Sequence, residues 1–294
     1  MSKPTIGFIG LGLMGRAMCD HMLDEGYQLT IMANRSREAV DAAVARGANE
    51  VKTPKEIAQA SDIIMLCIDT SKSVEGRMYG DDGVIAGLSA GKVVIDFGTS
   101  LPASTLKIGA DVAKTGATYL DSPIGRTPAH AKDGLLNLMC SGDKAGFDKA
   151  EPVLNDLGEN VFYLGALGSG HTIKLINNFY GMTVANAMAE AFAMADKMGV
   201  DGKQLHDVMA AGPLHSGMMD FVKAYAVDND PSMLAFAIKN AAKDVGYYAQ
   251  MSKDAGAESL MSQSTLKALR TATEDGMGDD MVSQMYDFYK KNMG

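Results

Sequence analysis

Tryptophan is absent from this chain of 294 residues, and cysteine is scarce. The three cysteines, Cys19, Cys67 and Cys140, lie far apart and form no CxxC pair. Such spacing excludes both a disulfide framework and a cysteine-based zinc site. We expect the three thiols to be small buried hydrophobic groups, and we expect no metal site in this protein.

Positive charge is also in short supply, with 27 Lys and Arg against 36 Asp and Glu and a formal net charge of −9. This balance disfavours a nucleic-acid partner or an anionic membrane surface. No apolar run reaches the ~20 residues that a membrane span needs. The apolar run 6–14 contains three glycines and is followed by Arg16, unlike a signal peptide. We therefore expect a cytoplasmic protein whose partner is a small molecule.

What the chain does contain is an alternation of strand and helix patterns through its first half. Strands are predicted at 5–10, 28–32, 62–68, 92–97, 118–122, 135–141 and 160–164. Segments with helical spacing, such as 37–46 and 54–60, separate most of them. This alternation predicts an α/β fold for residues 1–164, with a mostly parallel, doubly wound sheet of the Rossmann type.

The strand pattern stops after residue 164, and alanine and methionine become frequent. Residues 172–198 contain no proline and a single glycine, Gly181, which predicts one helix of roughly 40 Å. We expect an all-α domain over 165–294, joined to the first domain by this long interdomain helix. Its methionines at 182, 188, 194 and 198 are expected to fill the core.

A glycine-rich turn, Gly10-Leu11-Gly12-Leu13-Met14-Gly15, directly follows the first predicted strand. In a strand–turn–helix unit, the first glycine makes the tight turn and the second lets the backbone approach a pyrophosphate. The third glycine lets helix and strand pack closely, and the helix N-terminus faces the anion. The pattern predicts a dinucleotide site, although a tight turn without a ligand is the alternative interpretation.

The second predicted strand runs into Ala33, Asn34, Arg35 and Ser36, which include no carboxylate. NAD-binding proteins usually place an Asp or Glu here to bind the adenine ribose. Arginine and serine instead suit a 2′-phosphate, so NADPH is the favoured cofactor and NADH the alternative. A solvated surface charge is the competing interpretation of Arg35.

The start of the long helix carries a second candidate constellation. Lys174 and Asn178 are four residues apart and share a helix face, with Asn177 adjacent. A lysine ammonium can hold a carbonyl oxygen and donate a proton as hydride reaches the carbon. A Schiff base on the same lysine is the competing chemistry. A later helical stripe holds Lys243 and Tyr247, and on its own it is more typical of a core and its rim.

Residues 121–127, Asp-Ser-Pro-Ile-Gly-Arg-Thr, lie at the end of a predicted strand, where open α/β sheets bind their ligands. Arg126 offers a fork of donors and Thr127 a hydroxyl, a pair suited to an oxyanion. An ordinary surface turn is the alternative. We interpret the segment as a candidate anion anchor.

Together these motifs resemble the β-hydroxyacid dehydrogenases over nearly the whole chain. The pieces are 10–15, Val94-Ile95-Asp96 followed by Thr99, 121–127, 168–178, and Phe236 with Lys243-Asp244. The resemblance implies a Rossmann-type domain, a long interdomain helix and an α-helical domain, assembled as a homodimer or homotetramer. It also implies that Lys174 is the catalytic acid–base and that Asn178 helps hold the substrate.

The candidate residues fall into three groups. The catalytic candidates are Lys174 and Asn178, and the substrate-binding candidates are Ser122, Gly125, Arg126, Thr127, Asn177 and Lys243. The cofactor-binding candidates are Gly10, Leu11, Gly12, Leu13, Met14, Gly15, Asn34, Arg35, Ser36, Cys67, Ile68, Thr99 and Lys243. Contacts of Leu13, Met14, Ile68, Thr99 and Lys243 with the nicotinamide cofactor are implied by the resemblance.

Two departures from the family pattern bear on the substrate and the cofactor. Most members read Asp-Ala-Pro-Val-Ser-Gly-Gly, whereas Gly125, Arg126 and Thr127 stand here in place of the serine and paired glycines. The Gly-Arg-Thr variant is similar to the sulfolactaldehyde reductases within the family, which implies a sulfonate-bearing aldehyde. Those reductases carry a ribose-binding acid and use NADH, whereas this chain has no acid there.

Three functional interpretations therefore stay open. The first is an NAD(P)H-dependent reductase of sulfolactaldehyde. The second is a reductase of a carboxylate semialdehyde such as succinic, methylmalonic or tartronate semialdehyde, because arginine binds carboxylates as readily as sulfonates. The third is a dinucleotide-binding module without catalytic activity.

Overall fold

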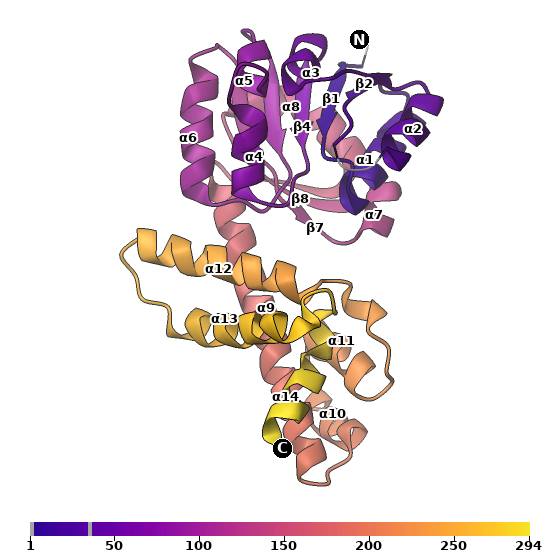
Figure 1. Cartoon of the computed structure of the whole chain (residues 1–294), viewed down its shortest axis with the longest axis vertical. Helices are drawn as coiled ribbons and strands as arrows, with labels where there is room; N and C mark the ends of the chain where they lie inside the picture. Colours follow the sequence, from indigo (N-terminus) through magenta and orange to yellow (C-terminus); the bar gives the residue numbers. More distant parts are fainter. Residues whose placement is uncertain (1–2, 35–36) are drawn as a thin grey trace. The chain divides into compact units, whose positions relative to one another are not determined.

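The structure is a computed structural model, and it describes residues 3–34 and 37–294. It divides into two compact units, Met1–Lys174 and Leu175–Gly294. The first unit combines a sheet with helices, and the second is helical (Figure 1).

The sheet of the first unit has the strand order β3-β2-β1-β4-β5-β6-β8-β7, with β9 paired to β8. Its strands are β1 (Ile6–Ile9), β2 (Leu29–Ile31), β3 (Asn49–Glu50), β4 (Ile63–Leu66), β5 (Val93–Asp96), β6 (Thr118–Asp121), β7 (Ile124–Gly125), β8 (Leu136–Gly142) and β9 (Gly158–Tyr163). The pairs β6·β8 and β7·β8 are antiparallel, and the other pairs are parallel. The seven predicted strands are confirmed, whereas the two-residue strands β3 and β7 were not predicted because neither has a hydrophobic run.

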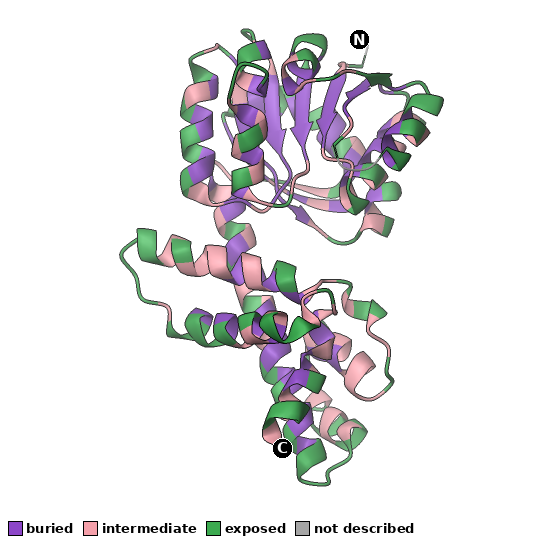
Figure 2. Cartoon of the chain, viewed as in Figure 1, coloured by how far each residue is buried: buried purple, intermediate pink, exposed green. Residues whose placement is uncertain are grey.

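Helices cover both faces of this sheet. They are α1 (Leu13–Asp24), α2 (Glu38–Ala45), α3 (Pro54–Ala60), α4 (Ser71–Met78), α5 (Val84–Gly87), α6 (Pro102–Ala113), α7 (Pro128–Lys132) and α8 (Lys144–Leu157). Alternate residues of β4 enter different cores, with Met65 packed in the same cluster as Met18 of α1 and Ile64 in the same cluster as Ile57 of α3. The central strands are buried along their length (Figure 2). Burial on both faces is what a doubly wound parallel sheet requires, so the predicted fold class is confirmed.

The second unit contains most of α9 (Ser169–Lys197), a continuous helix whose first turns belong to the first unit. It also contains α10 (Gly202–Ala210), α11 (Gly217–Ala226), α12 (Ile238–Asp254), α13 (Leu260–Ala272), α14 (Met285–Met293) and the short turns Ser232–Leu234, Thr273–Met277 and Val282–Gln284. Its core includes Met182 and Met188 of α9. Met194 and Met198 are 47% and 71% exposed, so the prediction that they fill the core was wrong. Met194 lies in the last turn of α9 and Met198 follows the end of the helix, and neither belongs to the core that contains Ala185, Ala189 and Phe192.

No helix among the described residues combines the length and the apolar character that crossing a bilayer would demand.

Candidate active site

The glycine turn between β1 and α1 is shaped by close backbone contacts. Gly10 has φ +109°, and a Cβ there would lie 2.2 Å from the carbonyl oxygen of Cys67. A Cβ at Gly15 would lie 1.9 Å from the carbonyl oxygen of Gly10. A Cβ at Gly12 would meet no atom of the described residues within 4 Å. The first and third glycines are therefore required by the fold itself, whereas the space beside the second is open to a ligand.

A cavity of about 520 Å³ opens beside this turn. It brings together six predicted cofactor-binding residues: Gly10, Leu11, Gly12, Asn34, Cys67 and Ile68. The N-terminal turn of α1 has no capping side chain and no acidic residue, so its amide groups face no carboxylate from their own helix. Open amides at a helix N-terminus suit a pyrophosphate, and the residues present fit a dinucleotide.

Four other predicted cofactor residues lie around the turn or on the neighbouring loop and do not line this cavity. Leu13 begins α1 and is 86% exposed, Met14 packs partly against the core, and Gly15 is buried. Thr99 is half-buried in the loop that follows β5. Arg35 and Ser36 lie outside the described residues, so their predicted roles stay predictions.

The cavity also contains residues that the sequence reasoning missed, among them Asp69, Ser73 and Arg77. Arg77 donates a hydrogen bond from Nη2 to Oδ1 of Asn34 over 2.8 Å. Arg77 belongs to α4, and the usable signal was that α4 follows β4, whose carboxyl end lies at the same sheet edge as that of β1. This places a guanidinium beside the end of β2, where the adenine ribose is bound in proteins of this fold.

Cys67 contributes a thiol to the cavity. Burial, reinforced by the nearby negative charge of Asp96, raises the pKa of this thiol to about 12. The thiol therefore keeps its proton at neutral pH and brings no negative charge to a site that must accept phosphate groups.

The segment 121–127 follows β6 as predicted, and its conformation is unusual at Arg126. This residue has φ +78°, in the left-handed region. Its Nη1 donates to the carbonyl oxygen of Leu135 over 2.8 Å and forms an ion pair with Glu159. Thr127 precedes α7, and its hydroxyl lies 2.8 Å from Nδ1 of His130.

The other substrate candidates of this segment, Ser122 and Gly125, lie close by along the chain. Ser122 is fully buried, and its hydroxyl makes no hydrogen bond within the described part of the chain. Gly125 is half-buried in β7, where a Cβ would lie 3.2 Å from Cβ of Asn137. Tight packing of this kind favours glycine at that position.

Lys174 and Asn178 lie one turn apart on the unbroken helix α9, as predicted. Lys174 is half-buried and belongs to the first unit, whereas Asn178 is 8% exposed and belongs to the second. Asn177 is exposed and donates from Nδ2 to Oδ1 of Asn178 over 3.1 Å.

Within the second unit, Asp244 connects the predicted residues of α9 and α12. Its Oδ2 accepts a hydrogen bond from Nδ2 of Asn178 over 2.6 Å, and its Oδ1 lies 3.0 Å from Nζ of Lys243. Asp244 is 2% exposed, so this carboxylate fixes the orientation of the Asn178 amide. The structure thus brings Asn178 and Lys243 together at a buried carboxylate that was not among the predicted site residues, with Asn177 bonded to Asn178.

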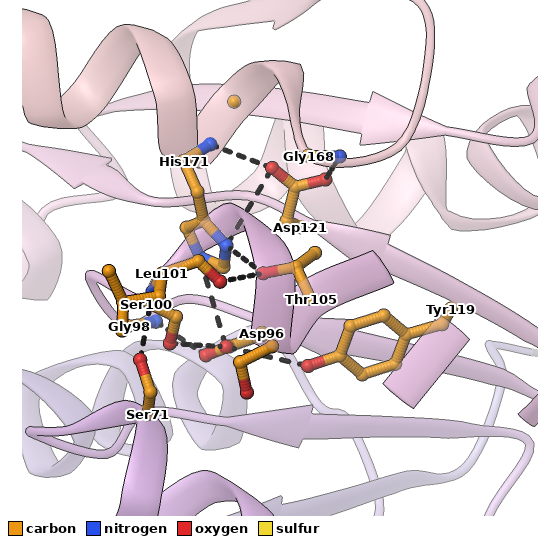
Figure 3. Close-up of polar contacts among 12 residues, drawn as sticks. Ser71, Asp96, Gly98, Ser100, Leu101, Thr105, Tyr119, Asp121, Gly168 and His171 are labelled. Carbon is orange, nitrogen blue, oxygen red and sulfur yellow. Dashed lines mark hydrogen bonds and ion pairs between the residues drawn. The ribbon is translucent and has the colours of Figure 1, made fainter. Parts of the chain in front are cut away.

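A buried polar network surrounds His171 in the first unit (Figure 3). His171 is fully buried, with Nδ1 2.7 Å from Oγ1 of Thr105 and Nε2 3.8 Å from Oδ2 of Asp96. Asp121 accepts hydrogen bonds from the backbone amides of Gly168 and His171 over 2.8 and 2.7 Å. These contacts join the ends of β5 and β6 to the first turn of α9.

In the part of the chain that the structure describes, no group of three or more His, Cys, Asp or Glu side chains is arranged to hold a metal ion.

Two family models match the chain. One, the NAD binding domain of 6-phosphogluconate dehydrogenase, matches residues 5–165. The other, described as NAD-binding of NADP-dependent 3-hydroxyisobutyrate dehydrogenase, matches residues 168–289. The two matches cover the sheet-containing and the helical parts in turn.

Individual relatives agree with the family models. The chain is 30% identical to 2-(hydroxymethyl)glutarate dehydrogenase of Eubacterium barkeri, over 98% of this chain and 96% of that protein. It is 27% identical to the chloroplastic glyoxylate/succinic semialdehyde reductase 2 of Arabidopsis thaliana, over 97% and 79% of the two chains. The solved structure of Mycobacterium tuberculosis 3-hydroxyisobutyrate dehydrogenase with L-serine has the same fold, with a TM-score of 0.89, 24% identity, and coverage of 98% and 99%.

The chain belongs to the β-hydroxyacid dehydrogenase family. It is an NAD(P)-dependent oxidoreductase that acts on CH–OH groups, and its cofactor is a nicotinamide dinucleotide.

Proposed function

We propose that this enzyme reduces a short aldehyde bearing an anionic group to the corresponding hydroxy acid. The leading substrate is 3-sulfolactaldehyde, which would yield 2,3-dihydroxypropane-1-sulfonate. The observation that carries the proposal is Arg126, an arginine with φ +78° where most family members have glycine. A left-handed conformation costs a non-glycine residue on the order of 1 kcal/mol, so retaining arginine there favours a functional reason.

The chemistry of the guanidinium supports an anion of this kind. Its hydrogen bond to Leu135 and its ion pair with Glu159 both use Nη1, whereas a guanidinium carries five N–H donors. The ion pair with Glu159 holds the side chain in place, and the other donors can bind the oxygens of a sulfonate. Thr127, next to Arg126 in the chain, would supply a further donor to the same anion, whereas the predicted role of Asn177, which belongs to the second unit, stays a prediction.

The proposed reaction assigns one task to each of the two catalytic candidates on α9, Lys174 and Asn178. When bound, the reduced nicotinamide supplies the hydride that reaches the carbonyl carbon. Lys174 Nζ donates a hydrogen bond to the carbonyl oxygen and then transfers a proton to it, which completes the alcohol. Asn178, oriented by Asp244, holds the substrate.

A carboxylate semialdehyde is the second candidate substrate. It is favoured by the name of the plant relative, a glyoxylate/succinic semialdehyde reductase. The two candidates differ in the anion that Arg126 would bind. A homodimer or homotetramer and a cytoplasmic location remain part of this proposal, on the strength of the family resemblance and the composition.

We expect the wild-type enzyme to prefer sulfolactaldehyde over succinic, methylmalonic and tartronate semialdehydes by more than about tenfold in kcat/KM. We expect Arg126→Gly to abolish that preference. Because glycine relieves the backbone strain at this position, the loss of activity should occur without a matching loss of thermal stability. Arg126→Lys, which keeps the charge but loses the planar fork, should show an intermediate preference. A wild-type preference of tenfold or more for a carboxylate substrate would refute the sulfonate proposal.

We further propose NADPH as the preferred cofactor, with NADH as the alternative. Arg35→Ala should weaken NADPH binding by about tenfold and leave NADH binding unchanged, because only NADPH carries the 2′-phosphate. Arg37→Ala is the matched control, since Arg37 already pairs with Asp41 and Glu50. Fluorescence titration of both cofactors measures the effect, and an Arg35→Ala variant with unchanged NADPH affinity would show that Arg35 is only a surface charge.

A further inference from the structure

The N-terminus of α9 is held by side chains that are distant in sequence. The first amides of a helix have no partner within the helix, and usually a local Ser, Thr, Asp or Asn side chain satisfies one of them. Here Asp121, at the end of β6, accepts from the amides of Gly168 and His171, and Ser141 of β8 accepts from the amide of Gly170 over 2.9 Å. Ser141 in turn donates to Asp121 over 2.5 Å. The capping groups thus lie 29 to 50 residues before the amides they satisfy.

This attachment is rigid because the backbone of the first turn of α9 packs directly against the sheet. A Cβ at Gly170 would lie 2.2 Å from the carbonyl oxygen of Met139 and 2.8 Å from Oδ2 of Asp121. Asp121 and Ser141 are both fully buried, so water does not compete for these hydrogen bonds. The first turn of α9 therefore cannot fray as a solvent-capped helix end does.

His171 adds a side-chain attachment to the same turn. The hydroxyl of Thr105 donates to the carbonyl oxygen of Leu101 over 3.2 Å, so we assign Nδ1 of His171 as the donor to Oγ1 of Thr105. His171 points into the space between Asp121 and Asp96 (Figure 3). Its Nε2 makes no hydrogen bond to any residue that the structure describes, so the bond to Thr105 fixes the ring.

We propose that Thr105, Asp121, Ser141 and His171, here called the α9 anchor, position Lys174 for proton transfer. Lys174 follows His171 by three residues, on the next turn of the helix. The orientation of the anchored turn and its position along the helix axis therefore determine where Nζ of Lys174 lies. Misplacement of a reacting group by about 1 Å can cost on the order of 100-fold in rate. The four side chains are positioning residues, and their proposed role rests on the proposed function of Lys174.

The most selective test uses Thr105, because two substitutions separate its hydroxyl from its volume. Thr105→Val keeps the shape and removes the bond to His171, whereas Thr105→Ser keeps the hydroxyl and removes a methyl group. We expect Thr105→Val to lower kcat by about tenfold with KM and the dinucleotide Kd nearly unchanged, and Thr105→Ser to restore kcat. Hydrogen exchange of the peptide 166–176 should accelerate in Thr105→Val and not in Thr105→Ser.

Ser141→Ala tests the backbone side of the anchor, and Asp143→Ala is its matched control. Asp143 caps α8 by accepting from the amide of Gly146 over 2.9 Å, and α8 carries none of the proposed site residues. We expect Ser141→Ala to lower kcat by more than about tenfold and Asp143→Ala to lower Tm without changing kcat at a temperature well below Tm.

Equal kcat values in Thr105→Val, Thr105→Ser and wild type would overturn the proposal, whatever their stability. If Ser141→Ala does not fold, the Thr105 pair decides alone. An active Lys174→Ala variant would instead refute the proposed proton donor. The anchor proposal fails by itself when Lys174→Ala is inactive and the Thr105 variants are fully active.

Discussion

Lys174→Ala should lower kcat by about 1,000-fold or more while leaving dinucleotide affinity nearly unchanged. A positioned general acid contributes roughly 100- to 10,000-fold, and the same ammonium also stabilises negative charge that develops on the carbonyl oxygen. The cavity beside the glycine turn is lined by the end of β1, the turn itself, the residues that follow β2 and β4, and parts of α2 and α4, and Lys174 is not among its lining residues. Steady-state kinetics combined with fluorescence titration of the reduced dinucleotide separates the two effects.

Two further lysine variants control this experiment. Lys174→Arg retains a positive charge but cannot release a proton at neutral pH. This variant should therefore bind the dinucleotide and the aldehyde and remain nearly inactive. Lys267→Ala removes an exposed lysine of α13 and should behave as wild type. Full activity of Lys174→Ala would leave the chain without a proton donor in the proposed place and would favour a different mechanism on the same fold.

Gly12→Ala and Gly15→Ala should separate ligand binding from folding at the dinucleotide turn. The Cβ of Gly12→Ala meets no atom of residues 3–34 and 37–294 within 4 Å, so Tm should stay within a few degrees of wild type. The same Cβ blocks the approach of a pyrophosphate to the backbone, and we expect a loss of dinucleotide affinity of about 100-fold. Gly15→Ala forces a contact of 1.9 Å with a backbone oxygen and should lower both Tm and affinity.

Thermal unfolding and dinucleotide titration of each variant provide the comparison, with Gly217→Ala as control. Gly217 begins α11 in the second unit, and a Cβ there also meets nothing within 4 Å in the described part of the chain. A Gly12→Ala variant that binds the dinucleotide as tightly as wild type would contradict the assignment of this turn to the pyrophosphate.

The fold could be predicted because its signals are local. Each central strand is a short apolar run bounded by turn residues, and the glycine turn fixes the first strand–helix unit. The sequence reasoning failed where structure depends on pairing with distant segments. β7 is a strand because Ile124 and Gly125 pair with Leu138 and Asn137 of β8, not because of any pattern of its own.

The candidate site residues also divide into those that local sequence patterns predict and those that depend on distant partners. Lys174 and Asn178 follow from helical spacing, and Gly10 and Gly12 from a motif. Arg77, Asp244 and the α9 anchor act through partners 29 to 66 residues away, and no periodicity reveals such pairs. The left-handed backbone of Arg126 was equally invisible, since an arginine gives no signal for positive φ.

The protonated thiol of Cys67 has a consequence for the chemical durability of the enzyme. Oxidants and alkylating reagents attack the thiolate form of cysteine. Because burial raises the pKa of the Cys67 thiol to about 12, almost none of it is in the thiolate form at neutral pH. We therefore expect the Cys67 thiol, although it borders the cavity beside the glycine turn, to react slowly with peroxide and alkylating reagents at neutral pH.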